Sequence, residues 1–205
     1  MSRTSDRGMV APIRDPGSDD VAPHLNFNIV LCTFRAGSRI AFRSATRAAC
    51  VRDTMADFPF ALRRYVKSDE DAAIELWRRT WQAAYPRLNF TERLDWWRAR
   101  WRRELVPACV IMVAQRDDAI VGFVTVDPAA GYLDQIVVAP EAWGSDLAAD
   151  LIAEAKRIAP AGLDLLVNQD NARALRFYEK HGFAITGADA NPISGAPLHR
   201  MSWRP

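Results

Sequence analysis

The polar side chains that could do chemistry gather in the second half of the chain, between residues 131 and 183. Tyr178 carries a phenol with an ordinary pKa of about 10, which can donate a proton to a thiolate whose free pKa is about 8.5. A helix that starts near Asp146 presents unpaired N–H groups and the positive end of its dipole, which suit a phosphate. Asn168 and Asn171 lie between these two features. Taken alone, this pattern indicates only a generic anion site.

The elements that hold these residues form a compact strand–helix–strand–helix unit. An apolar run over 133–139, rich in β-branched residues at its end and stopped by Pro140, predicts a strand. A helix is predicted over about 146–158 from apolar residues at helical spacing, followed by a buried strand over 163–167. The turn after that strand leads into a last helix over 172–180. The unit is of the βαβ type.

The rest of the chain completes an alternating pattern. Upstream we predict a strand over 60–66, helices over about 69–85 and 91–105, and a hairpin of strands over 109–115 and 119–126. Downstream, strands are predicted over 184–188 and 198–203. The expected order is β-α-α-β-β-β-α-β-α-β-β.

The sequence motif around the last helix is more specific than its hydrophobic periodicity. Asn168-x-x-Asn171-x-x-Ala174-x-x-Phe177-Tyr178-Glu179-x-x-Gly182-Phe183 resembles the C-terminal signature of the GNAT superfamily, the acyl-CoA-dependent N-acyltransferases. Val138-Ala139-Pro140-Glu141, with the helix that ends at 153–156, looks like the acyl-CoA-binding motif of that superfamily. The resemblance covers roughly residues 58–205. It implies an α/β (α+β) domain with a mixed, twisted sheet flanked by helices. The implied reaction moves an acetyl group from acetyl-CoA to a primary amine of a small molecule or peptide, without a metal.

The implied cofactor site is only partly matched. In the family the pyrophosphate lies on a loop written [QR]-x-x-G-x-[GA], which aligns with residues 143–148. Only Ala148 fits, because Trp143 replaces the basic or amide residue and Asp146 replaces the central glycine. A carboxylate there would repel phosphate, unless it caps the helix. The implied cofactor-binding residues are Gly144, Ser145, Asp146, Leu147, Ala148, Asn168 and Asn171, with the main chain of Ile136 and Val138. The two asparagines could equally form an Asx turn or a cap.

The resemblance also implies two catalytic residues. Tyr178 falls where family members commonly place the tyrosine that protonates the thiolate of departing CoA; the alternative is a packed aromatic beside Phe177. Asp134 lies on the strand where many relatives carry an acidic residue that removes the amine proton, directly or through water. An isolated aspartate near a strand start is more often solvated or a turn ligand.

Aromatic residues mark the two predicted helices that border the acceptor site in this superfamily. Trp77, Trp81 and Tyr85 share one stripe, so they could wall an acceptor pocket that favours an apolar amine. The alternative is that they belong to the core, where aromatic stripes at this spacing usually lie. The arginines of residues 98–103 are expected to form a solvated face.

Bulk properties narrow the remaining options. The formal net charge is +2, which argues against a nucleic-acid partner for the whole surface, and three cysteines without paired spacing indicate no disulfide scaffold or zinc site. Residues 1–54 hold eight arginines and five aspartates and are expected to be a disordered or non-native extension of the domain at 58–205. We expect a cytoplasmic protein without a transmembrane segment and allow for a homodimer.

Two alternatives remain open at this stage. The first is a non-catalytic acyl-CoA-binding protein that kept the fold but lost the loop chemistry, which Trp143 and Asp146 favour. The second is a membrane- or nucleic-acid-associated protein that uses the arginines of residues 35–52 and 98–103.

Overall fold

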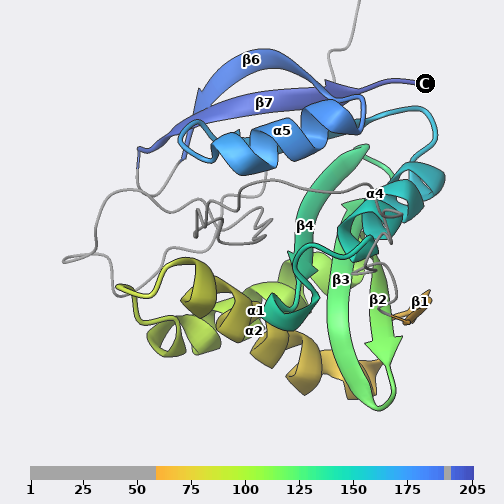
Figure 1. Ribbon diagram of the computed structural model, residues 1–205, viewed down its shortest axis with the longest axis vertical. Helices are drawn as coiled ribbons and strands as arrows, with labels where there is room; N and C mark the ends of the chain where they lie inside the picture. Colours follow the sequence, from red (N-terminus) through yellow and green to blue (C-terminus); the bar gives the residue numbers. More distant parts are fainter. Residues whose placement is uncertain (1–58, 192–194) are drawn as a thin grey trace, which may run out of the picture.

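The computed structural model describes residues 59–191 and 195–205, which contain a mixed sheet with helices packed on it (Figure 1). The strands are β1 (Ala61–Arg64), β2 (Val110–Arg116), β3 (Ala119–Asp127), β4 (Tyr132–Val138), β5 (Leu163–Asn168), β6 (Ala184–Ala190) and β7 (Pro197–Trp203). The helices are α1 (Glu70–Ala84), α2 (Leu94–Arg100), α3 (Val106–Ala108), α4 (Leu147–Ile158) and α5 (Ala172–Lys180). The predicted element order and fold class are confirmed. The extension predicted for residues 1–54 lies outside the described residues.

The sheet is built from two antiparallel groups joined at one place. Its strand order is β1-β2-β3-β4-β5-β7-β6, and β4 and β5 are the parallel neighbours. They share a single registered pair, Tyr132 with Asp164, and the Asp164 N–H donates to the Gly131 carbonyl at 2.8 Å. Beyond that pair the strands diverge, so the side of β4 that faces β5 has no ladder over most of its length. Figure 1 shows α5, β6 and β7 grouped apart from β2 and β3.

Helices cover both faces of the central strands. Every residue of β3 from Ile120 to Val126 is buried, which requires apolar cover on both sides. The Phe123 ring packs edge-on against Trp101 at 5.3 Å between ring centroids. On the other face, a Cβ added to Gly122 would lie 3.1 Å from the Leu147 side chain of α4. The glycine therefore lets α4 lie close to the sheet.

The second predicted helix is longer than expected and irregular. It begins with a 3₁₀ turn (Thr91–Arg93), continues as α2, widens into a π segment (Trp101–Leu105) and ends with α3. It was predicted to end at residue 105 but continues through Pro107, which lies inside α3, and the Cys109 N–H closes the helix on the Leu105 carbonyl at 2.8 Å. The wide turn begins directly after Arg100, a residue of the candidate site.

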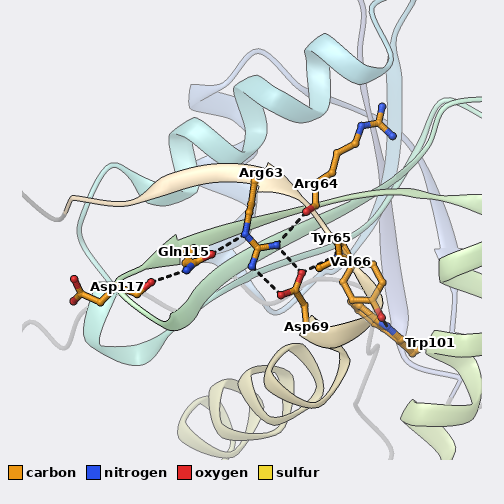
Figure 2. A network of polar contacts seen from close by, with 8 residues as sticks. All are labelled: Arg63, Arg64, Tyr65, Val66, Asp69, Trp101, Gln115 and Asp117. Carbon is orange, nitrogen blue, oxygen red and sulfur yellow. Dashed lines mark hydrogen bonds and ion pairs between the residues drawn. The ribbon is translucent and has the colours of Figure 1, made fainter.

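A polar network fixes β1 against the start of α1 (Figure 2). The Arg63 guanidinium forms two hydrogen bonds to the Asp69 carboxylate, at 2.7 and 2.8 Å, and a third to the Gln115 side chain of β2 at 2.7 Å. Asp69 also accepts from the Val66 N–H at 2.8 Å. Next to this network, the Trp101 indole donates to the Tyr65 hydroxyl at 3.2 Å. None of the helices in the described part of the chain is long and apolar enough to cross a membrane.

Candidate active site

The loop between β4 and α4 is held by its own side chains. The Trp143 indole N–H donates to the Val138 carbonyl at 2.9 Å, which ties the loop back to the end of β4. Gly144 adopts a φ of 90°, a conformation that a residue with a side chain rarely takes, and a Cβ there would meet nothing within 4 Å. The backbone at Gly144 is therefore open to an approaching ligand.

Ser145, not Asp146, takes the capping role at the start of α4. The Ser145 hydroxyl donates to the Ala142 carbonyl at 2.7 Å and accepts from the Leu147 N–H at 3.3 Å. Asp146 occupies the N-cap position, but its side chain makes no cap hydrogen bond and is exposed. The carboxylate thus adds negative charge near the helix start without satisfying a backbone donor. The N–H groups of Ala148 and the next residue lie in the first turn, where no partner exists within the helix.

The two asparagines after β5 differ in role. Asn171 caps α5, since its side-chain oxygen accepts from the Ala174 N–H at 3.0 Å. Asn168 is 7% exposed, and its Oδ1 has no hydrogen-bond partner among the described residues. With Asp170, Ala196 and Pro197 it lines a pocket of about 230 Å³. The amide oxygen of Asn168 is therefore a buried acceptor available to a ligand, whereas that of Asn171 is already engaged.

Tyr178 is completely buried, and its hydroxyl makes no hydrogen bond to any described residue. The ring packs edge-on against Phe177 and Phe183, each at 5.4 Å between centroids. Burial, and then the field of Tyr132, raise the pKa of Tyr178 well above 10, so the phenol stays protonated. Tyr132 is the residue at which β4 pairs with β5. A buried donor without an acceptor is unusual and calls for an explanation.

Asp134 is paired with an arginine from the irregular helix. Arg100 Nη1 and Nη2 donate to the two carboxylate oxygens at 3.0 and 2.6 Å, and Gln135 Nε2 donates to Oδ1 at 3.0 Å. The Arg100 and Asp134 side chains are 14% and 11% exposed. Arg100 also contacts Glu104 at 3.2 Å, and burial opposes the coulombic effect of Asp134 that raises the Arg100 pKa. These three hydrogen bonds fix the orientation of the Asp134 carboxylate, and the pairing with Arg100 was not predicted from the sequence.

The predicted aromatic stripe lies mostly in the core. Trp77 and Trp81 are fully buried, and Trp77 stacks on Trp97 with ring centroids 4.6 Å apart and planes 13° apart. Tyr85 is half-buried and stacks on Trp81 at 5.7 Å. Of the three residues proposed to wall an acceptor pocket, Tyr85 alone retains appreciable exposure.

The expectation of a solvated arginine face over residues 98–103 holds for the exposed Arg102 and Arg103 and is wrong for Arg100, which is largely buried. Arg98 and Arg102 both contact the Glu70 carboxylate, at 3.2 and 2.6 Å, and Arg98 also reaches Asp71 at 2.6 Å. These carboxylates belong to α1, about 30 residues earlier in the chain, so helical periodicity alone could not reveal the pairing. The arginines join α1 to α2 and its π extension instead of presenting a free basic surface.

Comparisons with known proteins bear on this geometry directly. Residues 70–183 match the sequence model of the Acetyltransferase (GNAT) family, which is more than half of the chain. The protein belongs to the GNAT acetyltransferase family. A curated relative, peptidyl-lysine N-acetyltransferase YjaB of Salmonella typhimurium, is 30% identical over 141 residues, which cover 66% of this chain and 91% of that protein.

Solved structures agree with this membership. The apo form of YjaB from Escherichia coli is 25% identical with a TM-score of 0.58, and the match covers 71% of this chain and 98% of that one. The PaiA N-acetyltransferase of Thermoplasma acidophilum, solved with coenzyme A, has a TM-score of 0.57 at 20% identity and shows the shared fold. The match covers 72% of this chain and 100% of that one. The GNAT protein is thus an acyl-CoA-dependent N-acetyltransferase that uses acetyl-CoA, and the alternative of a non-catalytic scaffold is not favoured.

The residues present fit acetyl-CoA. The diverging edge of β4, the open backbone at Gly144, the N–H groups of residues 148 and 149 in the first turn of α4 and the buried Asn168 oxygen offer the donors and acceptors that an extended diphosphate ester needs. Two features fit less well: the Val138 carbonyl already accepts from Trp143, and from Thr80 at 3.4 Å, and Asp146 brings a carboxylate to the loop. Among the described residues, no group of histidine, cysteine and acidic side chains could hold a metal ion.

Proposed function

We propose that this GNAT acetyltransferase acetylates the primary amine of a peptide, with the side chain of lysine as the first candidate, and that it acts in the cytoplasm. The buried hydroxyl of Tyr178 has no hydrogen-bond partner among the described residues, and it carries the proposal for the site because a buried phenol that keeps its proton can act as a proton donor. The name and coverage of the Salmonella relative support the peptide over a small-molecule acceptor. A homodimer stays a prediction.

Acetyl-CoA supplies the acyl group as an activated thioester. The N–H groups of the first turn of α4 and the open backbone at Gly144 bind phosphate oxygens. The main chain of β4 near Ile136 orients the bound arm. Tyr178 gives its proton to the thiolate of departing CoA, and its raised pKa ensures that the phenol still carries that proton when the thiolate forms. The phenolate regains a proton from water after CoA leaves.

The amine must lose a proton before it can attack, and Asp134 is the acidic group that we propose for this step. Both of its oxygens already accept hydrogen bonds from Arg100, which fix the orientation of the carboxylate. Oδ1 already accepts two hydrogen bonds, from Arg100 and Gln135, whereas Oδ2 accepts one and still has a lone pair available. We therefore propose that Asp134 orders a water molecule that carries the proton away, instead of taking it directly.

An acceptor screen with the full chain tests the proposal. Release of free CoA thiol is followed with acetyl-CoA and three acceptors: a lysine-containing peptide, the same peptide with its lysine acetylated, and a polyamine. We expect turnover with the first peptide and none with the blocked one. Titration calorimetry that shows acetyl-CoA binding, together with no transfer to any amine, would overturn the proposed activity. Transfer to the polyamine alone would overturn the peptide acceptor.

A further inference from the structure

The loop that we propose to bind pyrophosphate is strongly acidic. Residues 141–150 contain Glu141, Asp146 and Asp150 and no lysine or arginine. The position where the family's motif carries a basic or amide residue is occupied by Trp143, whose one N–H is already engaged with Val138. A diphosphate placed on this loop would meet helix N–H groups but no basic side chain of the loop itself, so its charge must be balanced from another element.

Helix α1 brings a cation to this loop. Nη1 of Arg79 lies 2.8 and 2.6 Å from the two carboxylate oxygens of Glu141, an ion pair between residues 62 positions apart. One residue on, the Thr80 hydroxyl donates to the Val138 carbonyl at 3.4 Å, so this turn of α1 is packed against the end of β4. Among the residues of 59–191 and 195–205, the pair of Arg79 with Glu141 is the ion pair that involves this loop.

The other two nitrogen atoms of the Arg79 guanidinium are available to a ligand. Nε and Nη2 donate to no residue in the described part of the chain, and the side chain is 33% exposed. A guanidinium has five donors in a plane that matches two oxygens of a phosphate. Because an exposed ion pair contributes little free energy, a phosphate can draw the guanidinium from Glu141 at small cost.

We propose that Arg79 is a binding residue for the pyrophosphate of acetyl-CoA and replaces, from α1, the cation that the loop itself lacks. Glu141 keeps the guanidinium beside the loop. This inference rests on the proposed use of the β4–α4 loop as the cofactor site. It names a residue that loop-motif comparison cannot find, because Arg79 precedes the loop by about 60 residues.

Two ligands distinguish a phosphate contact made by Arg79 from a purely structural role of this residue. Acetyl-CoA carries the pyrophosphate, whereas acetyl-pantetheine has the same reactive arm and no phosphate. Arg79→Gln should raise the Kd of acetyl-CoA about tenfold, as expected for the loss of a hydrogen bond between charged groups. The same variant should leave the KM for acetyl-pantetheine unchanged. Glu141→Gln should lower the Kd of acetyl-CoA, because it removes a competing carboxylate.

The neighbouring Arg78 is a matched control, because it lies on the same helix but pairs with Glu75 within α1. Arg78→Gln should alter the Kd of acetyl-CoA by less than about twofold. An unchanged Kd in Arg79→Gln would overturn the inference and leave the acetyltransferase proposal standing. An equal loss with acetyl-pantetheine would also overturn it, since the effect would then not come from phosphate. If the unaltered chain bound no acetyl-CoA, the proposed cofactor site and the role of Arg79 would both fall.

Discussion

Replacing Tyr178 with phenylalanine should raise the stability of the protein and at the same time lower its kcat. The substitution removes one oxygen and keeps the ring that packs on Phe177 and Phe183. Because the hydroxyl is buried and makes no hydrogen bond to a residue of 59–191 or 195–205, its removal breaks none of the described bonds and relieves a desolvation cost of about 1–3 kcal/mol. We expect the free energy of unfolding to rise by about 1 kcal/mol, with a Tm increase of roughly 2–4 °C for a domain of this size.

The same substitution should lower the turnover number. A positioned general acid contributes about 10²–10⁴ in rate, so kcat should fall at least about a hundredfold while the KM for acetyl-CoA changes little. The pKa of Tyr178 lies well above 10, so the phenol keeps its proton through the accessible range. The ratio of the two kcat values should therefore stay constant from about pH 6 to pH 10.

The assay is release of CoA thiol under saturating acceptor, with urea unfolding measured on the same samples. Tyr65→Phe is the matched control, because its hydroxyl accepts a hydrogen bond from Trp101 at 3.2 Å. It should lose about 1 kcal/mol of stability and keep its turnover. If Tyr178→Phe turned over at the unaltered rate, or lost stability as Tyr65→Phe does, the hydroxyl would not be the proton donor described here.

Two further expectations concern the ion pairs that join the helices to the site. Arg100→Met should lose about 3–5 kcal/mol in urea unfolding, because it leaves the Asp134 carboxylate buried and unpaired. The double variant Arg100→Met with Asp134→Leu should recover most of that loss, and a double variant no more stable than the single one would contradict the reasoning. The pKa of Glu70 is lowered, chiefly by its hydrogen bond from Arg102. Its contribution to stability is therefore present above pH 4.5, the ordinary pKa, and is lost as the pH falls through the lower folded value. Glu70→Gln should flatten the fall of unfolding free energy below about pH 5, and an unchanged slope would exclude Glu70 as its source.

Local signals predicted the elements around the site well. The last helix is found at the predicted residues 172–180, where an asparagine before it and a glycine after it mark its ends. The order of all eleven predicted elements also matches, since proline and hairpin signals separate them. The motif residues are placed by these same short-range features, so their approximate positions followed from the sequence.

Contacts between distant segments could not be predicted in the same way. Arg100 meets Asp134 across 34 residues and Arg79 meets Glu141 across 62, and neither pair follows from helical spacing. The π segment after Arg100 has no simple sequence signal either. Asp146 was a good candidate for an N-cap by residue type and occupies that position, but its side chain makes no cap hydrogen bond. Residue type therefore predicted the position of Asp146 and not the orientation of its side chain.

The divergence of β4 and β5 depends on two glycines that the motif does not include. Gly131 lies just before β4 with a φ of 61°, and a Cβ there would lie 3.1 Å from the Gly162 carbonyl just before β5. Gly162 has no room for a side chain, because a Cβ would lie 2.7 Å from Arg204. The strands can therefore meet closely at their first residues only, and one registered pair joins them there. From that fixed point they separate toward the ends that lead into the phosphate loop and the Asn168 turn. The two glycines thus allow the close approach at this one point, and the edge of β4 beyond it has no registered pair with β5.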